Sequence, residues 1–281
     1  MPTFQNKIDS HQHFWNTKRL DYPWMPPPPS VLQRNYLPAE LEPLLKANDI
    51  DGTVLVQAHQ SVKEANFLLD IAEANDFVAG VVAWVDLTSP DVGDVLDELM
   101  KRPKLVSIRH QVENDPDVAW LSREESVRGL REVAERELCY DLLVKPPHLK
   151  YVPALAEKIP ELRMVVNHIA KPLIAEDIME PWADEIAAVA KIPGVYCKVS
   201  GMVTEADHES WSVEGLKPYI NHIVDIFGIN RLMFGSDWPV CLLAATYEQV
   251  VGAALEAMEP LSEEHTAKFM GGNATDFYRL S

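Results

Sequence analysis

Lys7-Ile8-Asp9-Ser10-His11-Gln12-His13 begins as a short strand and ends in two histidines separated by one residue. Successive side chains of a strand point to opposite faces, so we expect His11 and His13 to project to the same side, close enough to share one ion. Neutral imidazole nitrogens at this spacing suit a divalent metal. Because a His-x-His triplet also arises by chance, its meaning depends on the rest of the chain.

Seven further apolar runs alternate with segments of helical pattern along the 281-residue chain. These runs lack the polar alternation of half-exposed strands, which indicates a parallel sheet covered by helices on both faces. Eight such units predict one domain over residues 1–281, an α/β protein with a (β/α)8 barrel, the TIM barrel. A doubly wound sheet is the alternative, although no glycine-rich nucleotide turn is present. The later strands are predicted at residues 53–57, 78–85, 105–109, 139–145, 163–168, 195–200 and 231–237.

A segment at about residues 14–36 fits neither helix nor strand and contains four consecutive prolines, 26–29. Such long loops are uncommon unless they are functional, so we expect this one to cover the site of the two histidines. A proline-rich ligand for another protein domain is the alternative. The aromatic side chains around the prolines are Phe14, Trp15, Tyr22 and Trp24.

Composition and charge limit the possible partners and the compartment. The net charge of −18 argues against nucleic acid and against an anionic membrane, and no apolar run is long enough for a transmembrane helix. The first residues do not resemble a signal peptide, and Cys139, Cys197 and Cys241 are expected to be buried, reduced thiols. These features predict a cytoplasmic protein and leave the oligomeric state open, a homo-oligomer included.

Functional residues of a (β/α)8 barrel lie at the C-terminal ends of its strands, and here each apolar run ends at a polar or titratable residue. A core alone would not require that pattern. Arg109, Lys145 and Lys198 also fit positions where strands reach the surface, and Gln57 and Ser200 fit residues that only complete hydrogen bonds. Histidines 59, 208, 222 and 265 are interpreted as surface residues. The candidates are His11, His13, Gln57, Trp84, Arg109, Lys145, His148, His168, Lys198, Ser200 and Asp237.

Several motifs together carry a family resemblance that spans nearly the whole chain. They are Asp9-Ser10-His11-Gln12-His13, Asn167-His168 and Gly235-Ser236-Asp237-Trp238-Pro239, supported by residues 141–149, 196–201 and 272–274. The set resembles the amidohydrolase superfamily, and within it the lactonase branch that contains L-fuconolactonase, L-rhamnonolactonase and the pyrone-dicarboxylate lactonases.

The resemblance implies a metal position at His11, His13 and Asp237, with His168 beside it and Asp237 as general base. One divalent ion, expected to be zinc, is implied, because the fourth strand ends in Ile108-Arg109 without a lysine for a bridging carbamate. Some lactonases of this branch work without any metal, so the ion is not an obligatory part of the expected chemistry.

The implied reaction is hydrolysis of a sugar-acid lactone, with Asp237 activating water and His168, Arg109 or Lys145 stabilising the oxyanion. A single arginine among the strand ends favours an uncharged lactone, such as L-fucono- or L-rhamnono-lactone, over a dicarboxylate. A metal-dependent non-oxidative decarboxylase and a non-catalytic ligand-binding barrel are the alternatives. Substrate contacts are expected from Trp24, Gln57, Trp84, Arg109, Lys145, His148 and Lys198.

Overall fold

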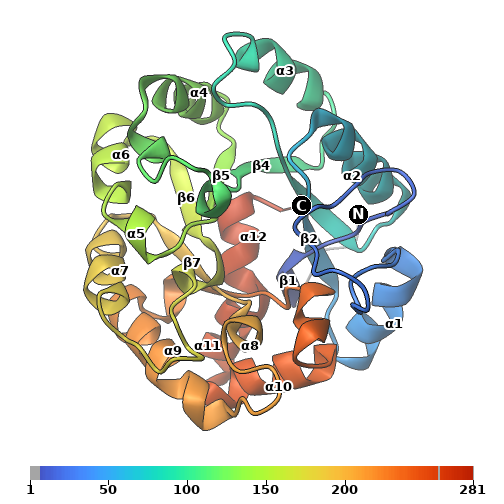
Figure 1. Ribbon diagram of the computed structural model, residues 1–281, viewed down its shortest axis with the longest axis vertical. Helices are drawn as coiled ribbons and strands as arrows, with labels where there is room; N and C mark the ends of the chain where they lie inside the picture. Colours follow the sequence, from blue (N-terminus) through green and yellow to red (C-terminus); the bar gives the residue numbers. More distant parts are fainter. Residues whose placement is uncertain (1–6, 259, 281) are drawn as a thin grey trace.

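Eight parallel strands form a single sheet in which each strand pairs with the next one along the chain. The computed structural model describes residues 7–258 and 260–280. Helices surround the strands, which confirms the predicted (β/α)8 barrel (Figure 1). The strands are β1 (Ile8–Gln12), β2 (Gly52–Val56), β3 (Val78–Ala83), β4 (Leu105–His110), β5 (Cys139–Leu142), β6 (Arg163–Val166), β7 (Tyr196–Val199) and β8 (Leu232–Phe234).

The outer helices bury one apolar face against the strands, as an amphipathic repeat requires. In α4 that face consists of Val127, Leu130 and Val133. The helices are α1 (Pro38–Ala47), α2 (Val62–Ala74), α3 (Val92–Leu99), α4 (Glu124–Glu135), α5 (Pro146–Leu149), α6 (Val152–Lys158), α7 (Trp182–Ala190), α8 (Met202–Glu205), α9 (Val213–Phe227), α10 (Tyr247–Ala257), α11 (Glu263–Ala267) and α12 (Asn273–Tyr278).

The chain that follows β8 closes the barrel against β1. The backbone N–H of His13 donates to the carbonyl of Trp238 at 2.7 Å, and the N–H of Asp237 donates to the carbonyl of His11 at 2.8 Å. These bonds place Asp237 beside both histidines of the first strand, although more than 220 residues separate them in the sequence.

Several strands end earlier than the sequence pattern predicts, among them β3, which ends at Ala83 and not at residue 85. β5 ends at Leu142, β6 at Val166 and β8 at Phe234. After β6 and β8 the chain adopts left-handed backbone angles, with φ of 53° at His168 and 57° at Asp237, which a strand does not accommodate. Both candidate catalytic residues therefore belong to turns that follow the strands.

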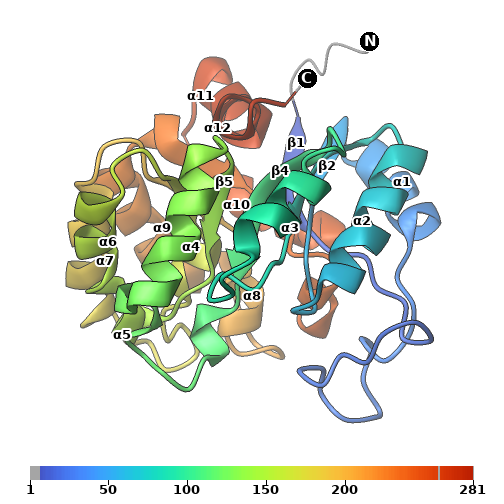
Figure 2. The ribbon, with the colours of Figure 1, turned by 90° about the horizontal axis from the view of Figure 1, so that it is seen from above.

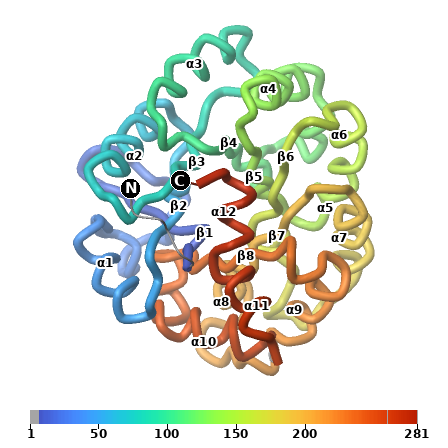
Figure 3. Tube along the Cα trace, turned by 180° about the vertical axis from the view of Figure 1, so that it is seen from behind, coloured from blue at the N-terminus to red at the C-terminus, as the bar shows by residue number. Residues whose placement is uncertain are grey.

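Helix α12 covers the N-terminal end of the barrel (Figure 3). Its Phe277 and Tyr278 belong to the same buried cluster as Ile8, Val54 and Met233 from the strands. The segment at residues 14–36 lies at the opposite end, where the strands end (Figure 2). Both ends of that segment are tied together, because Trp15 and Tyr36 exchange two backbone hydrogen bonds of 3.0 Å.

The remaining expectations on the chain as a whole concern thiols and membranes. Cys139, Cys197 and Cys241 are free and buried, which confirms the prediction. Within the described ranges, no helix combines the length and the apolar character that crossing a membrane requires.

Candidate active site

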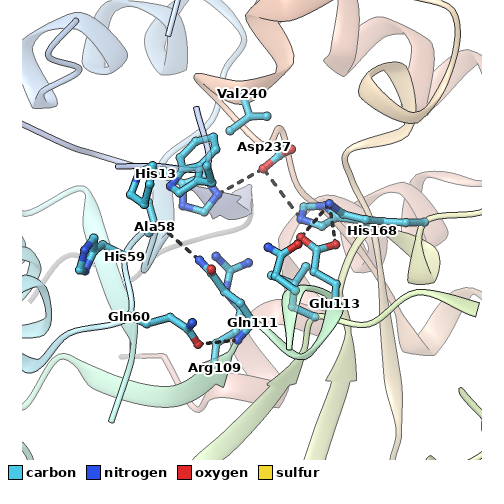
Figure 4. Close-up of a pocket in the computed structure, with 15 residues that line it drawn as sticks. His13, Ala58, His59, Gln60, Arg109, Gln111, Glu113, His168, Asp237 and Val240 are labelled. Carbon is cyan, nitrogen blue, oxygen red and sulfur yellow. Dashed lines mark hydrogen bonds and ion pairs between the residues drawn. The ribbon is translucent and has the colours of Figure 1, made fainter. Parts of the chain in front are cut away.

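A cavity of about 660 Å³ opens at the C-terminal ends of the strands. Its lining includes His13, Arg109, His168 and Asp237 from the strand ends, and Trp24 from the segment 14–36. In Figure 4, His13, Asp237 and His168 point toward one another. The segment 14–36, which we expect from the sequence to cover the site, thus forms part of the wall of this cavity.

Three histidines surround the carboxylate of Asp237. Its Oδ1 lies 3.2 Å from Nε2 of His13, 3.7 Å from Nε2 of His11 and 3.9 Å from Nε2 of His168. Burial lowers the pKa of His168 to about 3, so this imidazole is neutral near pH 7. Burial alone would raise the pKa of Asp237, but the interactions with His168 and His13 and the positive charge of Lys171 bring it below its ordinary value. The cluster therefore holds an ionised carboxylate beside a neutral imidazole.

The contacts of His13 suit a metal ligand. Its Nδ1 lies 2.7 Å from the carbonyl of Val56, so Nδ1 carries the proton and donates it. Nε2 then turns a lone pair toward Asp237 Oδ1, and two acceptors 3.2 Å apart need a proton or a metal ion between them. His11, His13 and Asp237 present ligand atoms that all lie within 4.8 Å of one another. Two imidazoles and a carboxylate form a donor set that fits one divalent ion such as zinc.

Two cationic side chains flank His11 in the same cluster. Arg109 Nη1 lies 3.3 Å from its Nε2, and Lys198 Nζ lies 3.4 Å from its Nδ1. Burial and these positive charges hold the pKa of His11 well below its ordinary value, so the ring is neutral. A neutral imidazole is the form that binds a metal ion, but the Arg109 guanidinium beside Nε2 repels any divalent ion bound to that nitrogen.

A strained backbone turn positions His168. Residues 168–171 all have positive φ, from 46° to 61°, a conformation that is uncommon for residues other than glycine. Gly201 makes room for the ring, because a Cβ at that position would lie 2.6 Å from His168 Nδ1. Ser200 Oγ lies 2.9 Å from the same nitrogen and orients the imidazole.

A buried polar network supports the site from below. Lys198 Nζ donates to Asp141 Oδ2 at 2.7 Å, and both side chains are completely buried. Asn167 links this pair to the cavity, since its amide donates to Asp141 at 2.9 Å and accepts from Arg109 Nη1 at 3.2 Å. Lys198 thus neutralises a buried carboxylate and does not belong to the cavity lining.

Of the residues expected to contact the substrate, Trp24 and Arg109 line the cavity. The others lie behind or beside the lining. Gln57 is buried and its amide donates to the carbonyl of Arg109 at 3.3 Å, and Trp84 Nε1 donates to His110 at 3.3 Å. Lys145 is exposed, and its backbone N–H donates to Nδ1 of His148. Of the residues expected to contact the substrate, the five that do not belong to the lining are Gln57, Trp84, Lys145, His148 and Lys198.

Sequence reasoning missed lining residues that lie on loops beyond the strand ends. Glu113 and Lys171 face the cavity as an ion pair, with 2.8 Å between Nζ and Oε2. His59, interpreted above as a surface residue, is half-buried and also lines the cavity. No apolar run ends at these positions, so the strand pattern carried no signal for them. The other lining residues missed in this way include Gln60, Gln111 and Asn114.

A buried carboxyl group organises the loop that carries His59. Glu64 of α2 is completely buried, and its Oε2 accepts the backbone N–H groups of Ala58 at 3.0 Å and His59 at 2.7 Å. Burial raises the pKa of Glu64 to about 7. Tyr22 of the segment 14–36 packs edge-on against His59, so Glu64 also supports the neighbouring wall.

Comparison with known proteins assigns the family. The model of the family described as Amidohydrolase matches residues 8–280. The protein belongs to the amidohydrolase family. This amidohydrolase is 37% identical to an L-fucono-1,5-lactonase of Burkholderia ambifaria, over 98% of its own chain and 96% of that relative. An L-fucono-1,5-lactonase of Burkholderia multivorans is 36% identical over the same shares.

The solved structures agree with this assignment. A crystal structure of an amidohydrolase from Burkholderia multivorans with bound zinc has a TM-score of 0.94 and 36% identity to this chain. The match covers 98% of this chain and 100% of that one. The barrel and its loops are therefore shared with a protein whose structure contains zinc.

Proposed function

We propose that this amidohydrolase hydrolyses a sugar-acid lactone to the open-chain hydroxy acid. The observation that carries the proposal is the identity of 36–37% to two L-fucono-1,5-lactonases over nearly the full length of each chain. The ionised Asp237, which lies beside neutral imidazoles in a large cavity, is consistent with that chemistry.

Asp237 is the proposed general base. Its carboxylate accepts a proton from water, and the water oxygen forms a bond to the lactone carbonyl carbon. When the tetrahedral intermediate collapses, the bond to the ring oxygen breaks and Asp237 returns the proton to that oxygen. The reaction consumes one water and leaves Asp237 ionised for the next cycle.

Arg109 and His168 are proposed to stabilise the oxyanion that forms on the carbonyl oxygen. The guanidinium is held by Asn167 and by the carbonyl of Gln57, and its Nε is buried without a hydrogen-bond partner in the described part of the chain. A fixed donor in a partly dry site costs no reorganisation during the reaction. A zinc ion held by His11, His13 and Asp237 would add Lewis-acid polarisation of the carbonyl.

The charges on the cavity wall favour an uncharged substrate. Arg109 and Lys171 are balanced by Glu113 and Asp237, so the lining offers no excess of cations to a dicarboxylate. Trp24 also lines the cavity, and an apolar side of a sugar ring can pack on an indole. We therefore propose a hydroxylated aldonolactone, such as L-fucono- or L-rhamnono-lactone, as the substrate.

A panel of sugar lactones, followed with a pH indicator, tests the proposal. Release of acid well above the spontaneous rate is expected with aldonolactones and not with the pyrone dicarboxylate. Carbon dioxide release from aromatic acids, with no effect on lactones, would identify the decarboxylase alternative instead. If neither lactone hydrolysis nor carbon dioxide release is detected, but a sugar lactone still binds, the protein is a non-catalytic barrel.

A further inference from the structure

The cavity contains a second group of charged side chains beside the cluster of His11, His13, His168 and Asp237. Lys171 Nζ donates to Glu113 Oε1 at 3.1 Å and lies 2.8 Å from its Oε2. Glu205 Oε1 lies 3.5 Å from the same ammonium group. Glu113 and Lys171 line the cavity, and their side chains are 9% and 20% exposed, so this pair is largely removed from water.

The backbone fixes the pair at a defined place relative to His168. Lys171 ends the left-handed turn that begins at His168, and its N–H donates to the carbonyl of His168 at 2.8 Å. The N–H of Glu113 donates to the carbonyl of Leu143 at 3.1 Å, just beyond β5. Glu113 and His168 both line the cavity (Figure 4). A surface ion pair would not need two such anchors.

An ammonium next to a carboxylate matches the chemistry of neighbouring hydroxyls. Each hydroxyl both donates and accepts, so one can accept from Lys171 while the next donates to Glu113. Hydrogen bonds to charged groups are stronger than neutral ones, and partial burial strengthens them further. With Glu205 included, the three side chains carry a net charge of −1, which disfavours an anionic group at this position.

We propose that Glu113 and Lys171 are specificity-determining residues that bind two neighbouring hydroxyls of the substrate. This inference rests on the proposed lactonase function. It assigns recognition of the sugar to this pair and leaves bond cleavage to Asp237 and the groups around it.

Two isosteric variants, Glu113→Gln and Lys171→Met, test the pair with two substrates. On an aldonolactone, kcat/KM should fall by about 10- to 100-fold, as expected for the loss of a charged hydrogen bond. On δ-valerolactone, which has no hydroxyl substituents, kcat/KM should fall clearly less than on the aldonolactone, because only the charge near Asp237 and His168 changes and no hydroxyl contact is lost. The exposed Lys150→Met is the matched control, and melting temperatures check folding.

Equal losses on both substrates, or no loss on either, would overturn the inference while lactone hydrolysis still stands. Calorimetric binding of a sugar lactam, compared with unsubstituted 2-piperidone, gives a readout without turnover. If the variants weaken binding of the sugar lactam alone, the hydroxyl contact is supported even when the wild type hydrolyses no lactone. In that case the proposed function fails and the inference survives as a sugar-binding site.

Discussion

Replacing Glu64 by glutamine should flatten the pH dependence of the stability of this amidohydrolase. The pKa of Glu64 is raised from 4.5 to about 7 by burial. Between these values the folded state binds the proton more tightly than the unfolded chain, so the free energy of unfolding falls as pH rises. The stabilisation is fully present below pH 4.5 and is lost as pH rises through about 7. For one such group the loss between pH 5 and 8 is about 2.5 kcal/mol.

Glutamine removes this titration and keeps the shape, because its side-chain oxygen still accepts from the N–H groups of Ala58 and His59. Urea unfolding of the wild type and of Glu64→Gln at pH 5, 6, 7 and 8 measures the difference, in which all other titrating groups cancel. The exposed Glu157→Gln is the control. Parallel pH profiles for the wild type and Glu64→Gln would refute the reasoning, since Glu64 would then titrate alike in both states.

Three further changes test the site. Gly201→Ala should lower kcat at least tenfold by displacing His168. The control is Gly194→Ala, which has a similar positive φ of 77° but no atom within 4 Å of the added Cβ, so it should lower only the stability. Equal kcat values for the two variants would contradict the role of Gly201. Trp24→Ala should raise KM for a sugar lactone by about tenfold with little change in melting temperature, and an unchanged KM would remove the indole from the binding site. Arg109→Gln should tighten zinc binding by about tenfold or more in a competition assay with a zinc indicator, because the substitution removes a positive charge next to the metal ligands. An unchanged affinity for zinc would contradict the proposed repulsion.

Much of the fold follows from the sequence because periodicity reports burial directly. Seven apolar runs correspond to β2–β8, since a strand covered on both faces has no polar alternation, and the polar opening stretch forms β1. The ends of β6 and β8 were predicted too late, because hydrophobicity does not report backbone angles. Nothing in the residue types of His168 and Asp237 requires the left-handed conformations that both adopt.

The site could be predicted only where its residues lie at strand ends. His11 and His13 share one face through simple strand geometry. The strand ends also indicated His168 and Asp237, and the resemblance supplied the roles of these two residues. Lys198 differs, because it also projects into the barrel but one layer deeper, where it pairs with Asp141.

The pair Glu113 and Lys171 could not be found from the strand pattern. Its position depends on the course of the loops after β4 and β6, and each residue alone looks like an ordinary surface charge. Only the three-dimensional structure shows that the two loops meet. The segment 14–36 was easier to interpret, because a proline- and aromatic-rich loop of that length needs a buried partner.

The most direct test of the account compares the wild type with Asp237→Asn in continuous measurement of acid release from L-fucono- or L-rhamnono-lactone. The account predicts rapid lactone opening by the wild type and a loss of about 10²–10⁴-fold in kcat for the variant, because asparagine cannot accept the proton from water. Melting temperature and binding of a sugar lactam should remain close to wild type. A wild type that opens neither lactone above the spontaneous rate, or a variant that keeps full kcat, would contradict the account.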